Sequence, residues 1–198
     1  MAASAGLSLL FLVVYGGCLW ITAHRREVGT FYFEWEHAIP FVPFMILPYL
    51  SIDLFFVAAP FLFTERGDLH RFVRRIVVTI VVAGLCFLSF PLRFGFPRPQ
   101  AGGWLGALFD WFRSVDAPYN LFPSLHAALL LLLCDAHARN LRGWARAGVL
   151  GWFALIALSP LLTHQHHMID ILGGLALAAL VSFATRRKIC LDPNERAS

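Results

Sequence analysis

Charged residues are scarce in this sequence. Asp, Glu, Lys and Arg together make up 14% of its 198 residues, whereas hydrophobic residues make up 59%. A soluble globular domain carries about 25% charged residues. The composition therefore excludes an ordinary soluble domain and predicts an all-α integral membrane protein, with the lipid bilayer as its surroundings. The chain is too short for two such domains, so residues 1–198 are expected to form one.

Cysteines are also few, and no two of them form a Cys-x-x-Cys pair. The four are Cys18, Cys86, Cys134 and Cys190, and the first three lie inside apolar runs. This spacing argues against a structural disulfide or a zinc knuckle and favours small, buried hydrophobic side chains. A large excess of positive charge is missing too, because the net charge is +4. In a membrane protein so small an excess reflects cytoplasmic anchoring, and we expect no nucleic-acid partner.

Six apolar stretches predict membrane helices, which need about 20 residues each. They cover residues 7–23, 39–63, 76–92, 122–138, 147–162 and 166–185. The first stretch has no basic segment before it and no convincing cleavage site after it, so we interpret it as a retained span and not as a signal peptide. Residues 27–38 mix aromatic with acidic side chains, which is typical of a segment at the membrane interface.

Basic residues gather on one side of these predicted spans. Eleven of the 16 Lys and Arg residues fall within residues 64–75, 139–146 and 186–198, and the other five fall on the opposite side. By the positive-inside rule, both termini are expected in the cytoplasm. The loop 93–121 and the starts of the fourth and sixth spans then face the extracytoplasmic side.

Three polar islands interrupt the apolar sequence on that extracytoplasmic side. In chain order, the first island, residues 93–99, contains two arginines. The second, residues 122–126, reads Phe-Pro-Ser-Leu-His, and the third, residues 164–170, reads His-Gln-His-His-Met-Ile-Asp. Ionisable groups beside membrane spans are costly and are functional candidates by default. We expect the three islands to form a single site with a nucleophile, a proton donor and a group that binds anions.

The third island contains a histidine and an aspartate at helical spacing. His166 and Asp170 are four residues apart, so on a helix they share one face. A carboxylate that binds one ring nitrogen fixes the tautomer and raises the basicity of the other, as a nucleophile or a general base requires. A buried pair that only joins two helices would have the same spacing, and the two roles stand equal here.

The second island has the composition of a helix start. Pro123 suits the first turn, and Asn120 is a candidate cap before it. Ser124 is then expected near the free backbone amides, which bind phosphate readily. His126 lies further along and is a candidate proton donor to a leaving oxygen. The alternative for His126 is a structural histidine at the helix start.

The first island follows the third predicted span. Arg93 and Arg98 are its two cations, and arginine is the preferred clamp for phosphoryl oxygens. Pro91, Pro97 and Pro99 restrict the motion of this loop. The alternative for the arginines is an anchor to lipid headgroups.

Together the islands resemble the signature of the type 2 phosphatidic acid phosphatase superfamily. Its first element ends in Arg-Pro, matched by Arg98-Pro99, and its second, Pro-Ser-x-His, is matched in full by residues 123–126. Its third element contains a serine, a histidine and an aspartate, often followed by a glycine. These fall on Ser159, His166, Asp170 and Gly174. The match covers residues 91–174, and the six-helix plan extends it to the whole chain.

Two positions depart from the pattern of this superfamily. The lysine of its first element is Pro91 here, and the arginine beside Ser159 is Pro160. Arg93 is a candidate to replace the first cation, and His164 to replace part of the second. Ser159 itself either binds near the site or closes the fifth helix. The departures resemble the inositol-phosphoceramide-synthase-like branch, where Phe-Pro-Ser-Leu-His and Gln-His are typical.

The resemblance implies an enzyme that acts on a lipid phosphate without a metal or any other cofactor. The two arginines and Ser124 would hold the phosphate. His166, oriented by Asp170, would attack phosphorus to form a phosphohistidine, and His126 would protonate the leaving oxygen. The expected substrates are polyprenyl diphosphate, phosphatidic acid or phosphatidylglycerol phosphate. Because the branch includes transferases, transfer to an alcohol is the alternative to hydrolysis.

Two other classes of function fit parts of the sequence. His164, His166, His167 and Asp170 are dense enough to suggest zinc or iron, but membrane di-iron oxidases use several histidine clusters and this chain has one. A lipid-binding or transport protein without catalysis is the second class, although no inverted repeat is evident. We expect His167 to pack or to contact a headgroup and not to take part in catalysis directly.

Overall fold

A computed structural model describes residues 1–139 and 141–185 of the chain. Within these residues the secondary structure is helical and contains no strand, which confirms the all-α prediction. The α-helices are α1 (Ala2–Ala23), α2 (Ile46–Ala58), α3 (Arg66–Ser89), α4 (Gly103–Val115), α5 (Leu125–Ala138), α6 (Gly143–Leu162) and α7 (Met168–Ala184). Short 3-10 segments precede and extend α2; they are η1 (Glu34–Ala38), η2 (Pro43–Met45) and η3 (Ala59–Leu62). The basic tail expected in the cytoplasm, with Cys190, lies outside the described residues.

Several of these helices have the length and composition of membrane spans. Four helical stretches are long and apolar enough to cross a bilayer: Ala2–Ala23, Pro43–Leu62, Arg66–Ser89 and Gly143–Leu162. They correspond to the first, second, third and fifth predicted spans. The fourth and sixth are apolar but shorter, because α5 has 14 residues and α7 has 17. Each begins later than predicted, since the polar island before it forms a helix cap and a loop.

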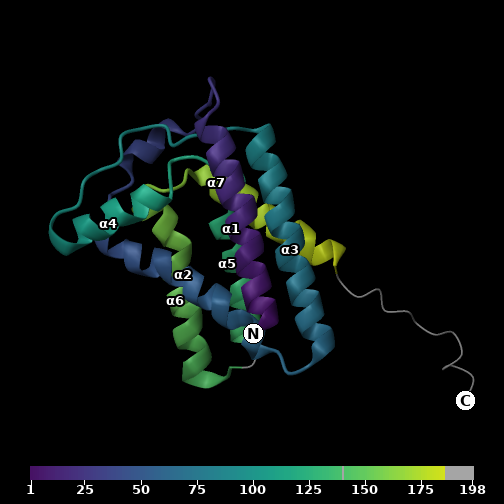
Figure 1. Cartoon of the computed structure of the whole chain (residues 1–198). Coiled ribbons are helices and arrows are strands. Elements are labelled where there is room, and N and C mark those ends of the chain that lie inside the picture. The colour runs from purple at the N-terminus through teal and green to yellow at the C-terminus, as the bar shows by residue number, and fades with distance from the viewer. Residues whose placement is uncertain (140, 186–198) are drawn as a thin grey trace, which may run out of the picture.

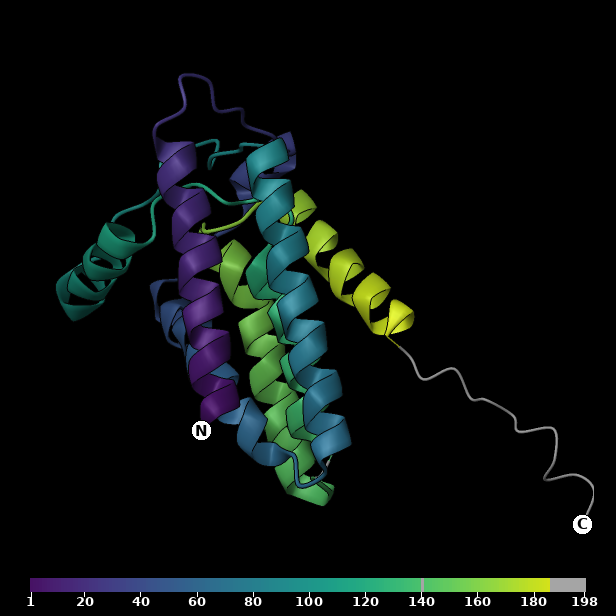
Figure 2. The same ribbon diagram turned by 45° about the vertical axis from the view of Figure 1, so that its right-hand side comes forward.

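The helices alternate in direction around a central α5 (Figure 1). α1, α3 and α6 run toward one end of the bundle, and α2, α5 and α7 run back from it. α1 and α3 lie side by side, whereas α7 leans away from the bundle toward its own end (Figure 2). α5 is buried on nearly all sides, as its run of leucines and alanines requires. We call the end where α5 and α7 begin the site end.

The starts of α5 and α7 are joined at the site end. Ser124 caps α5, because its hydroxyl oxygen accepts a hydrogen bond of 3.2 Å from the backbone N–H of Ala127. The backbone N–H of Ser124 donates to the carbonyl oxygen of Asp170 at 2.8 Å. A Cβ atom at Gly174 would meet the Ser124 carbonyl oxygen at 2.2 Å, so only glycine permits this approach. The second and third polar islands are therefore neighbours in space.

Helix α4 lies in a segment that the sequence predicts as loop. Its buried residues Leu105, Phe109 and Phe112 fall on one face and pack with Ile46 and Tyr49 of α2. Its opposite face exposes two large aromatic side chains, those of Trp104 and Trp111. This division between a packed and an exposed apolar face is typical of a helix at a membrane interface.

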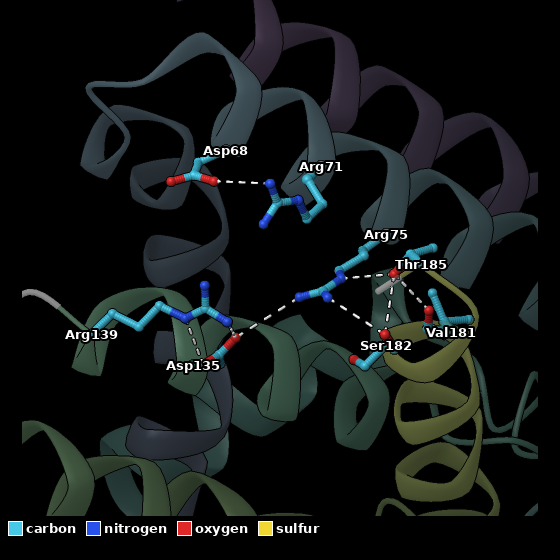
Figure 3. A network of polar contacts seen from close by, with 8 residues as sticks. All are labelled: Asp68, Arg71, Arg75, Asp135, Arg139, Val181, Ser182 and Thr185. Atoms are coloured by element: carbon cyan, nitrogen blue, oxygen red, sulfur yellow. Dashed lines mark hydrogen bonds and ion pairs between the residues drawn. The ribbon is translucent and has the colours of Figure 1, made fainter. Parts of the chain in front are cut away.

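The opposite end of the bundle carries the basic residues and a polar network (Figure 3). Arg75 of α3 donates to the hydroxyl of Thr185 at 2.9 Å and lies 4.0 Å from the carboxylate of Asp135 on α5. Arg139 pairs with the same carboxylate through two of its nitrogens. The prediction of a loop over residues 64–75 is wrong, because α3 begins at Arg66 and its first charged turns extend beyond the apolar part of the helix.

Candidate active site

The three polar islands lie together at the site end. The backbone N–H of Gly95 donates to Nε2 of His167 at 3.0 Å, which brings the first island to the third. The bond between Ser124 and Asp170 brings the second island to the third. The shared site expected from the sequence is therefore geometrically possible, and the position of each side chain decides what it can do.

His166 and Asp170 lie beside each other without a hydrogen bond. Nδ1 of His166 is 3.7 Å from Oδ2 of Asp170, and both side chains are almost fully buried. That distance is too long for a hydrogen bond. Nδ1 of His166 and Oδ1 of Asp170 have no partner among the described residues. The two groups are therefore adjacent but not hydrogen-bonded.

His126 is held in place by its neighbours on α2 and α6. Its ring stacks on that of Tyr49, with centroids 4.5 Å apart and 12° between the planes. Its Nε2 lies 3.4 Å from the carbonyl oxygen of Ile156. A carbonyl oxygen only accepts, so Nε2 carries a proton toward Ile156, and Nδ1 is the nitrogen left to give or take a proton at a ligand.

A cavity of about 280 Å³ contains His126 and His166 in its wall. It lies between α1, α2, α4 and the start of α5. Its polar lining residues are Tyr15, Tyr49, Asp53, Asp116, Asn120, His126 and His166. Leu12 of α1 and Val115 of α4 also line it and are 65% and 60% exposed, so the cavity reaches the lateral surface of the bundle between these helices. A lateral, apolar mouth suits a lipid ligand.

The two arginines of the first island occupy different environments. Arg98 is half-buried, with its guanidinium 5.5 Å from the centre of the Phe94 ring. Burial lowers the pKa of Arg98, and the nearby Asp116 carboxyl raises it, which places these two groups within electrostatic range. Arg93 is exposed and does not line the cavity, and its backbone N–H donates to the Gly29 carbonyl oxygen. Its role as a second phosphate clamp stays a prediction.

Three other predicted site residues act in the local fold. Ser124 is fully buried and uses its hydroxyl oxygen as the cap of α5. Asn120 is not the cap; it has φ of 56°, and its amide donates to the carbonyl oxygen of Tyr15. Ser159 is fully buried and donates to the carbonyl oxygen of Ile156 within α6, which continues to Leu162. Of these three, only Asn120 lines the cavity.

His164 lies outside the cavity wall, in the loop after α6. Its Nε2 lies 3.1 Å from the carbonyl oxygen of Ile39 and therefore donates to it. Burial lowers the pKa of His164, the hydrogen bond to Ile39 raises it, and the charge of Arg113 lowers it. Replacement of the missing arginine by His164 stays a prediction.

His167 and Glu36 form a buried pair that the sequence does not predict. Nδ1 of His167 is 2.7 Å from a carboxylate oxygen of Glu36, and the two side chains are 0% and 1% exposed. Because Nε2 of His167 accepts from Gly95, Nδ1 carries the proton that binds Glu36. The pair thus ties residues 34–38 and the arginine loop to the start of α7. This agrees with a packing role for His167.

Tyr15 and Asp116 are further site residues that the sequence does not predict. The hydroxyl of Tyr15 donates to Oδ1 of Asp116 at 2.7 Å, across 101 positions of sequence. Burial raises the pKa of the Asp116 carboxyl, while the bond from Tyr15 and the nearby His166 and Arg98 lower it. In the sequence, the only sign of such a pair is that Asp116 is an acidic residue in the short segment before Asn120.

The histidines of the third island do not converge on one point. His164 binds the Ile39 carbonyl, His167 binds Glu36, and His166 faces Asp170. Within residues 1–139 and 141–185, no three His, Cys, Asp or Glu side chains lie together as metal ligands would.

Comparisons with protein-family models, with curated proteins and with solved structures find no match to this chain. The function of the site is therefore inferred from its residues and their geometry.

Proposed function

We propose that this protein is an integral membrane enzyme that removes a phosphoryl group from a lipid phosphate through a phosphohistidine. The observation that carries the proposal is that His126 and His166 line one cavity that opens sideways between α1 and α4. Asp170, in the first turn of α7, lies 3.7 Å from His166, which precedes that helix. Two histidines, a carboxylate and a lateral apolar mouth are what such a reaction on a lipid requires.

The chemistry would begin at His166. The Nδ1–H group of His166 would donate a hydrogen bond to the Asp170 carboxylate, which leaves Nε2 as the nucleophile. This is the role that a carboxylate has beside a catalytic histidine. Nε2 attacks phosphorus in line, and a P–N bond forms as the P–O bond to the leaving group breaks. His126 donates a proton to the leaving oxygen. Water then loses a proton to His126 and attacks phosphorus, which releases phosphate and restores His166.

Positive charge for the phosphoryl group would come from Arg98 and from the His166 ring, which becomes cationic as Nε2 bonds phosphorus. Arg98 does not line the cavity, but its charge interacts with those of the lining residues Tyr49 and Asp116. Fixed charges in a partly buried site stabilise a phosphoryl transition state more strongly than they would in water. Ser124 would contribute by holding the start of α5 in place.

The substrate class follows from the mouth of the cavity. The tail of a lipid would lie against the exposed apolar side chains of α1 and α4, with its phosphate at the histidines. Polyprenyl diphosphate, phosphatidic acid and phosphatidylglycerol phosphate are the candidates. The positive-inside rule places the site on the extracytoplasmic side and both termini in the cytoplasm.

A second candidate is transfer of the phosphoryl group to an alcohol in place of water. The observation that favours it is that Asp116 and Asn120 line the cavity beside His166. Their side-chain oxygens accept hydrogen bonds, which an alcohol donates.

The test is phosphate release from these lipid phosphates, in detergent and with a metal chelator present. Wild type is compared with His166→Ala and with His70→Ala, a control at an exposed histidine of α3. We expect chelator-resistant release that is lost only in His166→Ala, together with loss of an acid-labile phosphoenzyme. Release that disappears with chelator would overturn the metal-free mechanism. Folded protein that binds lipid but transfers phosphate to neither water nor alcohol would favour a non-catalytic role.

A further inference from the structure

The cavity has a wall of hydrogen-bond acceptors that the proposed hydrolysis does not use. The hydroxyl of Tyr15 is committed to Oδ1 of Asp116, and Nδ2 of Asn120 is committed to the Tyr15 carbonyl oxygen. The atoms that remain are the second carboxyl oxygen of Asp116 and Oδ1 of Asn120. Both accept hydrogen bonds, so this wall calls for a ligand that donates them.

Asn120 provides this wall with a buried acceptor that has no partner. The residue is 2% exposed and lines the cavity, and its Oδ1 has no partner within the described part of the chain. A buried acceptor without a partner costs about 1–3 kcal/mol. The backbone holds it there at φ of 56°, a conformation that asparagine adopts more readily than most residues.

The charge of this wall excludes the phosphate itself as the ligand. A phosphate oxygen would meet the Asp116 carboxyl and would carry charge of the same sign. The phosphoryl group therefore belongs on the side of His166 and Arg98. A hydroxyl group has no such conflict, because it donates to a carboxyl or an amide oxygen.

We propose that Tyr15, Asp116 and Asn120 form a subsite for a hydroxyl-rich alcohol held beside His166, and that this alcohol accepts the phosphoryl group. The proposal rests on the proposed function, since the phosphohistidine at His166 supplies the group that is transferred. One hydroxyl of the alcohol reacts, and a second hydroxyl binds Asp116 and Asn120.

The transfer step balances without another reactant. The reacting hydroxyl gives its proton to His126, and its oxygen attacks phosphorus. A P–O bond forms as the P–N bond to His166 breaks, and the product is the phosphate ester of the alcohol. The proton on His126 replaces the one that it gave to the first leaving oxygen.

The subsite suits a hydroxyl better than an ammonium group. Burial raises the pKa of the Asp116 carboxyl, whereas the hydrogen bond from Tyr15 and the charges of His166 and Arg98 lower it. The subsite uses the ionised carboxylate, whose charge Arg98 partly offsets. That offset weakens the attraction for a cation and leaves hydrogen bonding as the main attraction.

The experiment measures how the phosphoenzyme divides its phosphoryl group between acceptors. Detergent-solubilised protein receives radiolabelled phosphatidic acid or farnesyl diphosphate, with chelator and equal concentrations of glycerol and 1-propanol. These alcohols are similar in size, but only glycerol has further hydroxyls for the subsite. We expect glycerol phosphate to exceed propyl phosphate by about tenfold or more, the worth of one or two good hydrogen bonds.

The ratio of the two products is then compared among variants. In Asp116→Ala and Asn120→Gly, the ratio of glycerol phosphate to propyl phosphate should fall to the value set by the intrinsic reactivity of the two alcohols. Glycine is chosen at position 120 because it adopts a positive φ freely and so preserves the backbone. Asp110→Ala, at an exposed carboxylate of α4, should keep the wild-type ratio.

Each result bears on a different conclusion. Transfer without a preference for glycerol, or a preference unchanged in both variants, would overturn the subsite alone. A preference for 3-amino-1-propanol over glycerol would show that the wall binds ammonium and would overturn the hydroxyl assignment. Absence of transfer from either donor, to alcohol or to water, would overturn the proposed function and the subsite with it.

Discussion

Asp170 places one of its carboxylate oxygens between two neighbours. Oδ2 accepts the backbone N–H of His167 at 2.8 Å and so holds the first turn of α7. The same oxygen lies 3.7 Å from Nδ1 of His166, and Oδ1 has no partner in the described structure. The fold thus fixes the carboxylate beside the histidine.

Asp170→Asn tests whether His166 depends on the charge of this carboxylate. The asparagine oxygen can still accept the His167 N–H, but the neutral amide no longer stabilises positive charge on the His166 ring or strongly fixes a proton on Nδ1. We expect turnover to fall by about 10⁴-fold, as in the analogous serine-protease triad, while thermal stability stays near wild type. Turnover and phosphoenzyme level are the measurements. A loss smaller than about 10²-fold would argue that Asp170 only joins helices.

His164 predicts a pH dependence of stability. Burial lowers its pKa in the folded state, whereas the unfolded chain has a value of about 6.5. The unfolded state therefore binds more protons below that pH, so the contribution of His164 is present above about pH 6.5 and is lost as the pH falls. Unfolding temperatures of wild type and His164→Asn between about pH 7.5 and pH 5 should converge at the acidic end. Parallel curves would contradict this assignment.

At the scale of elements, the approach of α7 to α5 depends on Gly174. A methyl group there would meet a backbone oxygen, which cannot rotate away as a side chain does. We expect Gly174→Ala to lower the free energy of unfolding by about 1–3 kcal/mol. Gly151→Ala is the matched control, since no heavy atom lies within 4 Å of a Cβ at that exposed position of α6.

The control should be neutral or slightly stabilising, because alanine favours a helix over glycine by about 1 kcal/mol. Thermal unfolding in detergent measures both variants. Equal stability of Gly174→Ala and wild type would mean that α7 can shift outward without loss, and the junction between the two islands would then be looser than described.

The elements that follow from the sequence are those with long apolar runs. α4 was not predicted because its packed face, Leu105, Phe109 and Phe112, is short and is interrupted by Asp110 and Arg113. The order of the predicted spans placed the three polar islands on one side of the membrane and so predicted that they cluster. The partners Tyr15 and Asp116, and likewise Glu36 and His167, lie more than a hundred positions apart, and no local pattern links them. Their pairing comes from packing alone.

For the whole molecule, the two ends of the bundle differ in charge. The cations of the described helix ends, such as Arg66, Arg74 and Arg142, lie at the end opposite the site. We expect that end in the cytoplasm. In intact cells, with the native cysteines replaced, a cysteine at Glu27 should react with an impermeant maleimide and one at Asp68 should not. Labelling of Asp68→Cys alone would invert the proposed topology.

The shortness of α5 has a consequence for the bilayer itself. Its 14 residues rise about 21 Å, whereas the hydrocarbon layer is about 30 Å thick. The four longer helical stretches match that thickness, so α5 leaves about 9 Å of it to the segments at its two ends. Because the other helices surround α5, protein and not lipid fills that depth. A lipid that brings its phosphate to His126 would therefore lower its headgroup into the bundle while its tails remain in the hydrocarbon.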